Sequence, residues 1–350
     1  MRCRTHTWSR TLLTLLALAL LATGAAQAAE KMKGYAEYRK GEALIVDGQR
    51  VVVTKSTKIN GTSRKARDFT SIPLGYEVNL KGTRRDDGSI RAREIEASRN
   101  RDTDIDVELS KSFDAIEALF LEKGRMVMVD ENGKVVEDLG KLLTSGPLVE
   151  RTRRIATRLA PPSVRPEDFR VYVVENDEWN AVAAPNFSIY VFSGLLRDMD
   201  DDEVAIVVGH ELAHATYEHS RRQYEKSSLV QQGTAVASEV AGGLIKNKMA
   251  GDLTKMGMGY SAMTLVNVYS RDAEDQADRV GLRYAFEAGY DVSKGPKLWE
   301  RFAEKYGESS AATNFFLGDH SRASTRAKLL TKEIDYNYPG GDTKKASDKP

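Results

Sequence analysis

The feature that most constrains this chain is the pentapeptide His210-Glu211-Leu212-Ala213-His214, which follows the apolar run from Val204 to Gly209. Histidines four positions apart lie about 40° from each other around an α-helix, so both imidazoles can reach one metal ion while the glutamate contacts a water molecule on it. Asp200 and Glu203 form a capping signature where this helix would begin. The sequence therefore predicts a buried helix with the chemistry of a zinc hydrolase. The alternative is a core helix whose histidines only form hydrogen bonds.

The first 28 residues have the pattern of a cleavable secretory signal. Arginines within residues 1–10 precede the apolar run Leu12–Ala22, which is too short to span a membrane comfortably, and Ala26-Gln27-Ala28 is a cleavage site. The single cysteine, Cys3, lies in this signal, and no cysteine follows the apolar run as a lipoprotein signal requires. We therefore expect a soluble periplasmic protein with no disulfide and no lipid anchor.

Charge and hydropathy argue against two classes of partner. The chain has 52 Lys and Arg against 51 Asp and Glu, a net charge of +1, so no overall field favours nucleic acid or an anionic membrane. After the signal, no apolar run approaches about 18 residues, so we expect no transmembrane helix.

Residues 29–105 are expected to form a small all-β domain. Short segments such as Ala43–Val46 and Val51–Thr54 are separated by turn residues such as Asp47-Gly48, with no helical period. The runs V-D-G-Q-R-V-V-V-T and D-D-G-S-I-R-A-R-E-I resemble a barrel-like domain of unknown function found in many bacterial secreted proteins. Such barrels can bind oligosaccharides, nucleic acid or peptide, but a spacer or a module for a docking partner is the favoured interpretation.

The rest of the chain shows a mixed pattern of helices and short strands. Residues 106–147 are predicted to be a linker with a helix near Ser112–Leu121 and a hairpin through Asn132-Gly133, and residues 335–350 a disordered tail. Ser227–Val266 is predicted to form two helices. Between these segments we expect strands at Arg170–Val174 and Phe187–Phe192, a loop at Asn180–Pro185, and helices at Leu148–Leu159, Arg271–Ala288, Trp299–Lys305 and Ser324–Ile334.

A catalytic zinc ion needs a third protein ligand besides the two histidines. The metzincin arrangement is excluded, because Ser220 occupies the position of its distal histidine and Tyr217 that of its glycine. His219 would lie about 180° around the helix from His210, so we expect it to point away as a packing or surface histidine.

Two carboxylates on a later helix remain as candidates. Glu274 and Asp278 lie one helical turn apart, beside the small residues Ala277 and Gly281 that would let two helices approach closely. Spacing alone leaves open the alternative of a solvated acidic face.

The H-E-L-A-H motif followed by E-D-Q-A-D resembles the HtpX-like zinc peptidases, a gluzincin family that also includes the CaaX prenyl proteases. The resemblance implies that Glu274 is the third zinc ligand and that Asp278 is a supporting acid or proton donor. It covers about Leu148–Leu330 and includes N-A-V-A-A-P-N-F-S-I-Y-V-F-S-G-L-L from Asn180, where Asn186-Phe187 replace two glycines of the family. The soluble periplasmic, BepA-like branch is the most similar.

The resemblance also implies roles outside the zinc helix. His320 and Arg326 match the family pattern H-P-x-x-x-x-R, with Ser321 in place of the proline, so His320 would donate a hydrogen bond to the reaction's oxyanion. We expect Phe187–Phe192 to be an edge strand that pairs with an extended peptide substrate. The predicted substrate-binding residues are Asn180, Ile189 and Val191.

Together these patterns predict an α+β chain in which a small barrel-like domain precedes a zincin-like metallopeptidase domain at residues 148–334, mostly helical with a small sheet. The predicted activity is that of an endopeptidase with one zinc ion per chain and Glu211 as general base. Family and compartment suggest quality control of unfolded or misassembled envelope proteins. The alternatives are a non-hydrolytic chaperone or docking factor that retains the zinc site, and zinc-dependent hydrolysis of a non-protein envelope substrate.

Overall fold

The computed structural model describes residues 29–61, 72–100, 104–129, 134–162, 164–165, 168–225, 269–307 and 323–338. The predicted signal, the predicted helices at Ser227–Val266 and His320 lie outside the described residues. The chain divides into two compact units, one of Met1–Ile72 with Val78–Ser98 and the other of Pro73–Glu77 with Arg99–Pro350. Among the described residues, no helix is both long and apolar enough to cross a membrane.

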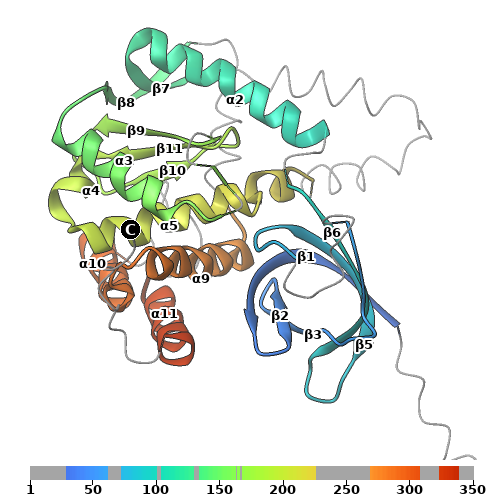
Figure 1. Ribbon diagram of the computed structural model, residues 1–350. Helices are drawn as coiled ribbons and strands as arrows, with labels where there is room; N and C mark the ends of the chain where they lie inside the picture. Colours follow the sequence, from blue (N-terminus) through green and yellow to red (C-terminus); the bar gives the residue numbers. More distant parts are fainter. Residues whose placement is uncertain are drawn as a thin grey trace, which may run out of the picture. The chain divides into compact units, whose positions relative to one another are not determined.

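The first unit contains a six-stranded sheet in the order β3-β2-β1-β5-β6-β4 (Figure 1). An additional parallel pairing of β3 with β6 closes the strands into a barrel, as the sequence predicts. At the turn between β2 and β3, Asp47 and Gly48 both have positive φ, the conformation that a tight hairpin requires. The strands are β1 Ala29–Lys40, β2 Ala43–Val46, β3 Gln49–Val52, β4 Lys58–Asn60, β5 Glu77–Arg84 and β6 Ile90–Ser98.

The second unit is built on a five-stranded sheet in the order β10-β11-β9-β8-β7, with β11 and β9 parallel and the other pairs antiparallel. The strands are β7 Arg125–Val129, β8 Val135–Leu143, β9 Arg170–Glu175, β10 Ala181–Ala183 and β11 Ser188–Phe192. The helix α2 (Asp104–Lys123) precedes β7, and both contribute side chains to the core beneath this sheet. The helix and the strand pair predicted within residues 106–147 are present as α2 and as β7 with β8. They are part of the second unit rather than a linker, because apolar residues such as Phe113 and Met126 are buried in this core.

The position of β11 also differs from the prediction. This strand lies between β10 and β9, so it is an inner strand and the edge of the sheet is β10, in the segment that was predicted to be a loop. All five residues of β11 are buried. A continuous apolar strand is typical of an inner position, whereas an edge strand more often alternates.

After β8, the described part of the second unit contains six α-helices with defined bounds and a further helical segment at residues 219–225. The six helices are α3 Pro147–Leu159, α4 Ser193–Asp198, α5 Asp201–Thr216, α9 Arg271–Glu287, α10 Gly295–Tyr306 and α11 Ala323–Asn337. The last helix reaches three residues into the predicted disordered tail, and an Asn337–Glu333 hydrogen bond joins its final turn. The predicted capping box of α5 is confirmed, since Asp200 accepts from the backbone of Glu203 while the Glu203 side chain accepts from the backbone of Asp200.

Helix α5 lies between the sheet and α9 (Figure 1). Two glycines allow α5 and α9 to approach closely, as predicted from Gly281. A Cβ atom on Gly281 would lie 2.5 Å from the His210 backbone nitrogen, and one on Gly209 would lie 2.7 Å from the Gly281 carbonyl oxygen. Any larger residue would separate the helices, so this crossing brings the acidic residues of α9 to the histidines of α5.

Candidate metal centre

The three predicted metal ligands lie together between α5 and α9. The Nε2 atoms of His210 and His214 are 2.9 Å apart, and the carboxylate oxygens of Glu274 lie 3.4 Å from the first and 3.6 Å from the second. All three side chains are buried, and their ligand atoms lie within 4.8 Å of one another. Two imidazoles and one carboxylate form a known donor set for catalytic zinc. This group can therefore hold a metal ion.

The Nδ1 atom of His210 contacts a buried ion pair formed by Asp278 and Arg326. This atom donates to Oδ1 of Asp278 at 2.9 Å, and the Arg326 guanidinium donates to both oxygens of that carboxylate, at 2.6 and 2.8 Å. Arg326 also lies over the Trp299 ring, 3.5 Å from its centroid. Burial and the Arg326 charge disfavour a proton on His210, but its hydrogen bonds to Asp278 and Glu274 outweigh them and raise its pKa to about 9.

The same geometry bears on the predicted role of Asp278. Burial opposes its ionisation, but the charge and hydrogen bonds of Arg326, together with the His210 hydrogen bond, hold its pKa well below the ordinary value. An ionised carboxylate accepts hydrogen bonds and has no proton to give. Asp278 is therefore placed to orient His210 rather than to act as a proton donor.

His219 does not point away from the site. Its Nδ1 lies 2.8 Å from Nδ1 of His214, its Nε2 lies 3.0 Å from Oε1 of Gln276, and its side chain is buried. The prediction failed because it extended α5 past Thr216. Glu218 has a φ of 53° and interrupts the helix, and the helical residues 219–225 follow this break. Burial lowers the pKa of His219 to about 3, so its imidazole is neutral at ordinary pH.

The predicted base, Glu211, lies between the metal ligands and the edge strand. Its Oε2 accepts a hydrogen bond from the backbone of Ala183 in β10 at 2.8 Å. Burial, with the charge of Glu274, raises the pKa of Glu211 to about 7. A carboxylate with this pKa can both take and return a proton near neutral pH.

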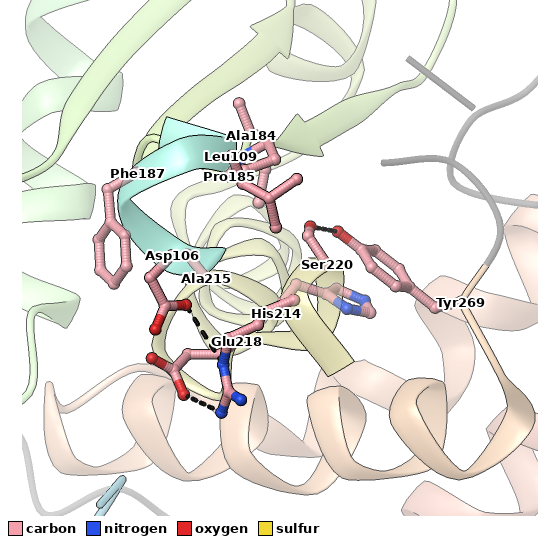
Figure 2. Close-up of a pocket in the computed structure, with 12 residues that line it drawn as sticks. Asp106, Leu109, Ala184, Pro185, Phe187, His214, Ala215, Glu218, Ser220 and Tyr269 are labelled. Carbon is pink, nitrogen blue, oxygen red and sulfur yellow. Dashed lines mark hydrogen bonds and ion pairs between the residues drawn. The ribbon is translucent and has the colours of Figure 1, made fainter. Parts of the chain in front are cut away.

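A small cavity lies beside His214 (Figure 2). Its volume of about 30 Å³ is enough for roughly two water molecules. Leu109 and Pro185 line one part of it, the Ser220–Tyr269 hydrogen bond lies at another, and Arg221 pairs with Asp106 and Glu218 at a third (Figure 2). The cavity therefore joins the metal ligands to the turn that follows β10.

That turn keeps a glycine-like shape although it contains no glycine. Phe187, which lines the cavity, has a φ of 65°, a conformation that costs a residue with a side chain roughly 1–2 kcal/mol. Asn186 supports the turn, because its side chain accepts from the backbone of Ser188 and donates to Asp114. This chain therefore forms the turn with Asn186-Phe187, and only Phe187 of the two takes a positive φ.

Two of the three predicted substrate-binding residues are unsuitable. Ile189 and Val191 lie in β11, where each faces a partner in β10 and in β9, and neither side chain is exposed. Asn180 directly precedes β10, and its buried Oδ1 has no hydrogen-bond partner among the described residues. Its backbone oxygen accepts from Phe192. Only Asn180 remains a candidate for substrate binding.

In the sequence Arg326 is only one position of a pattern, whereas in the structure it pairs with Asp278, the residue that holds His210. The six-residue spacing from His320 was the available signal. His320 itself lies outside the described residues, so its predicted role is untested.

Comparison with known families gives two matches along the chain. The model of peptidase family M48 matches residues 146–334. This range contains the three candidate metal ligands and also Glu211, Asp278 and Arg326. A domain of unknown function, DUF5666, matches residues 36–96, within the strands of the barrel.

Several curated proteins are similar to the chain. The mitochondrial metalloendopeptidase OMA1 of Bos taurus is 30% identical over 181 residues, covering 49% of this chain and 34% of the relative. Metalloprotease YcaL of Escherichia coli K12 is 28% identical over 66% of this chain and 88% of its own length. The beta-barrel assembly-enhancing protease of Yersinia pestis is 28% identical over 39% of this chain and 29% of its own. The chain thus spans only 31% to 41% of the length of the OMA1 relatives from Bos taurus, Arabidopsis thaliana and Danio rerio.

Proposed function

The chain belongs to peptidase family M48, and on that premise we propose that it is a zinc-dependent endopeptidase that cleaves unfolded or misassembled proteins of the cell envelope. The observation that carries the proposal is the cluster of His210, His214 and Glu274, with Glu211 next to it on the same helix. Each histidine has its Nδ1 engaged by another side chain, which leaves both Nε2 atoms on the metal side. When bound there, zinc acidifies a water molecule and polarises the scissile carbonyl.

Glu211 is the proposed general base. It takes a proton from the attacking water and passes it to the amine that leaves when the peptide bond breaks. The Ala183 N–H holds one carboxylate oxygen, which fixes the side chain while the other oxygen remains for the proton. His320 is proposed to donate a hydrogen bond to the oxyanion.

The edge strand β10 is the proposed site of substrate pairing. Val182 pairs with Tyr190 of β11, while the Asn180 carbonyl and the Ala184 N–H also bond to that strand. In an antiparallel pair the backbone groups of alternate residues point to opposite sides, so those of Ala181 and Ala183 face away from β11. The Ala183 N–H is bonded to Glu211, so the groups proposed to pair with a peptide are the Ala181 N–H and the carbonyls of Ala181 and Ala183. A peptide that pairs there is recognised through its backbone, which supports broad cleavage of unfolded chains. Asn180 would contribute its unpartnered side-chain oxygen.

The compartment and the role of the barrel are part of the proposal. The signal predicted at residues 1–28 favours a periplasmic protein, and one relative is named a beta-barrel assembly-enhancing protease. The barrel is proposed to be a spacer or a docking module for a partner.

The test is cleavage of casein and of an unfolded outer-membrane protein by the purified, zinc-loaded chain. Wild type should cut both, a chelator should stop it, and Glu211→Gln should abolish cleavage while zinc stays bound. Glu287→Gln, which removes a surface carboxylate of α9, is the matched control and should cleave normally. If wild type binds unfolded chains without cutting them, the protein is a chaperone or docking factor instead. Undiminished turnover by Glu211→Gln would remove that residue from the mechanism.

A further inference from the structure

A chain of hydrogen bonds extends from His214 away from the metal position. His214 Nδ1 lies 2.8 Å from His219 Nδ1, and His219 Nε2 lies 3.0 Å from Gln276 Oε1. The same Gln276 oxygen accepts from Nη1 of Arg222 at 2.7 Å. His214, His219 and Gln276 are all buried, and they come from α5, from the helical residues after it, and from α9.

The chemistry of Arg222 sets the direction of every bond in this chain. A guanidinium only donates, so the Gln276 amide atom that faces it must be the oxygen. An amide oxygen only accepts, so Nε2 of His219 must carry a proton. A neutral imidazole has one N–H, which leaves a lone pair on Nδ1 of His219 to accept from Nδ1–H of His214. His214 then carries its proton on Nδ1 and a lone pair on Nε2, the atom that faces Glu274 and His210.

The opposite arrangement would defeat metal binding. If His219 donated from Nδ1, His214 would carry its proton on Nε2, where it would block coordination. That arrangement would also set the Nε2 lone pair of His219 against the Gln276 oxygen, which Arg222 holds in place. Only one tautomer of each histidine therefore satisfies all four residues.

We infer that His219 is a positioning residue that, locked by Gln276 and Arg222, holds His214 in the tautomer and orientation needed to bind the metal ion. The inference rests on the proposed zinc site and adds a role that the zinc-binding motif does not contain. Partners behind metal-binding histidines typically change metal affinity by about 10- to 100-fold when they are lost. His219 needs no contact with substrate to have this effect.

Zinc affinity, measured by competition with a chromophoric chelator, tests the inference without any cleavage assay. His219→Ala should weaken zinc binding by about 10- to 100-fold. His219→Asn should restore most of the affinity, because its Oδ1 occupies the place of the imidazole Nδ1 and also accepts. Thr216→Ala is the matched control, since it removes a buried hydrogen bond to Tyr284 at the end of α5, the helix of His214, and should leave zinc affinity unchanged.

Nitrogen-15 NMR of the histidine side chains supplies a readout that packing alone does not move. In the full chain, His219 should show its proton on Nε2, and Gln276→Met, which removes the acceptor, should give a mixture of tautomers. Wild-type zinc affinity in a folded His219→Ala variant overturns the inference, as does a His219→Asn variant as weak as His219→Ala. If neither variant folds, an Nδ1–H tautomer in the wild type overturns it. Normal zinc binding without peptide cleavage would instead contradict the proposed function and leave this inference standing.

Discussion

The two histidines that face the metal position are held by different chemistry. His210 bonds to Asp278, which pairs with Arg326, and we call these two residues the charged side. His214 bonds to the neutral His219, which bonds to the Gln276 amide, and we call these two the neutral side. Hydrogen bonds to charged groups contribute roughly 1.5–3 kcal/mol and neutral ones roughly 0.5–1.5 kcal/mol. The charged pair binds its histidine more strongly, but it also raises that histidine's affinity for a proton. On the other side the charged group, Arg222, bonds to Gln276, and the residue that bonds to His214 is the neutral His219. The site therefore combines one histidine that is held strongly with another whose tautomer is fixed.

The largest effect is expected on the charged side. Arg326→Met leaves the Asp278 carboxylate buried without its main partner, and loss of one member of a buried pair typically costs about 3–5 kcal/mol. Urea unfolding of the full chain should show this loss. Arg283→Met, which removes a partly exposed pair with Glu287, is the control and should cost about 1 kcal/mol or less. Equal losses of stability in the two variants would show that the buried Asp278–Arg326 pair contributes no more than an exposed one.

The next effect concerns His320, which precedes Arg326 in the chain. If it donates to the oxyanion, His320→Ala should lower kcat by roughly a hundredfold, about 3 kcal/mol, with KM and zinc content unchanged. Steady-state kinetics on a fluorogenic peptide measure this. Loss of zinc in this variant would instead make His320 a ligand and remove Glu274 from that role.

Zinc affinity is also expected to fall as the pH falls, because of the charged groups around His210. Since Asp278 and Glu274 raise the pKa of His210 to about 9, zinc must displace a proton from it at neutral pH. Below that pKa, each fall of one pH unit should weaken zinc binding by about tenfold, equivalent to about 1.4 kcal/mol. The pKa of His219, lowered to about 3, adds nothing in this range. Calorimetry at several pH values, in buffers of different ionisation enthalpy, should detect the released proton. A zinc affinity that does not depend on pH would contradict the proposal that His210 is protonated before zinc binds.

The smallest predicted effect concerns backbone strain in the residues that line the cavity beside His214. Phe187 and Glu218, which line the cavity beside His214, both have positive φ. Phe187→Gly should therefore be more stable than Phe187→Ala by about 1 kcal/mol, since both lose the ring but only alanine keeps the strain. At Phe113 in α2 the order should reverse, because glycine is about 1 kcal/mol worse than alanine within a helix. Thermal unfolding of the four variants measures both differences.

Sequence reasoning located the residues whose relations are local. His210, Glu211 and His214 share one helix, so the helical period was enough to bring them together. Glu274 needed the family resemblance, because spacing alone could not separate a ligand from a solvated acidic face. The close crossing of α5 and α9 was predictable from the small size of Gly281.

The features that the sequence did not predict depend on an interruption of the helical or strand pattern, or on contacts between residues far apart in the chain. His219 was misplaced because one residue with positive φ, Glu218, redirects the chain after α5. The edge strand β10 has only three residues, too few to show a β pattern. The pair of Asp278 with Arg326 joins residues 48 positions apart, and no local signal connects their charges.

The most direct test of the metal centre is X-ray absorption at the zinc edge on the full, zinc-loaded chain. We expect one zinc ion with two imidazole nitrogens and carboxylate or water oxygens at about 2.0–2.2 Å. Glu274→Ala should lower the zinc content and change the oxygen shell, while Glu287→Ala should leave the spectrum unchanged. A spectrum with three imidazoles would contradict the assignment of Glu274 and would give the third position to another histidine of the chain.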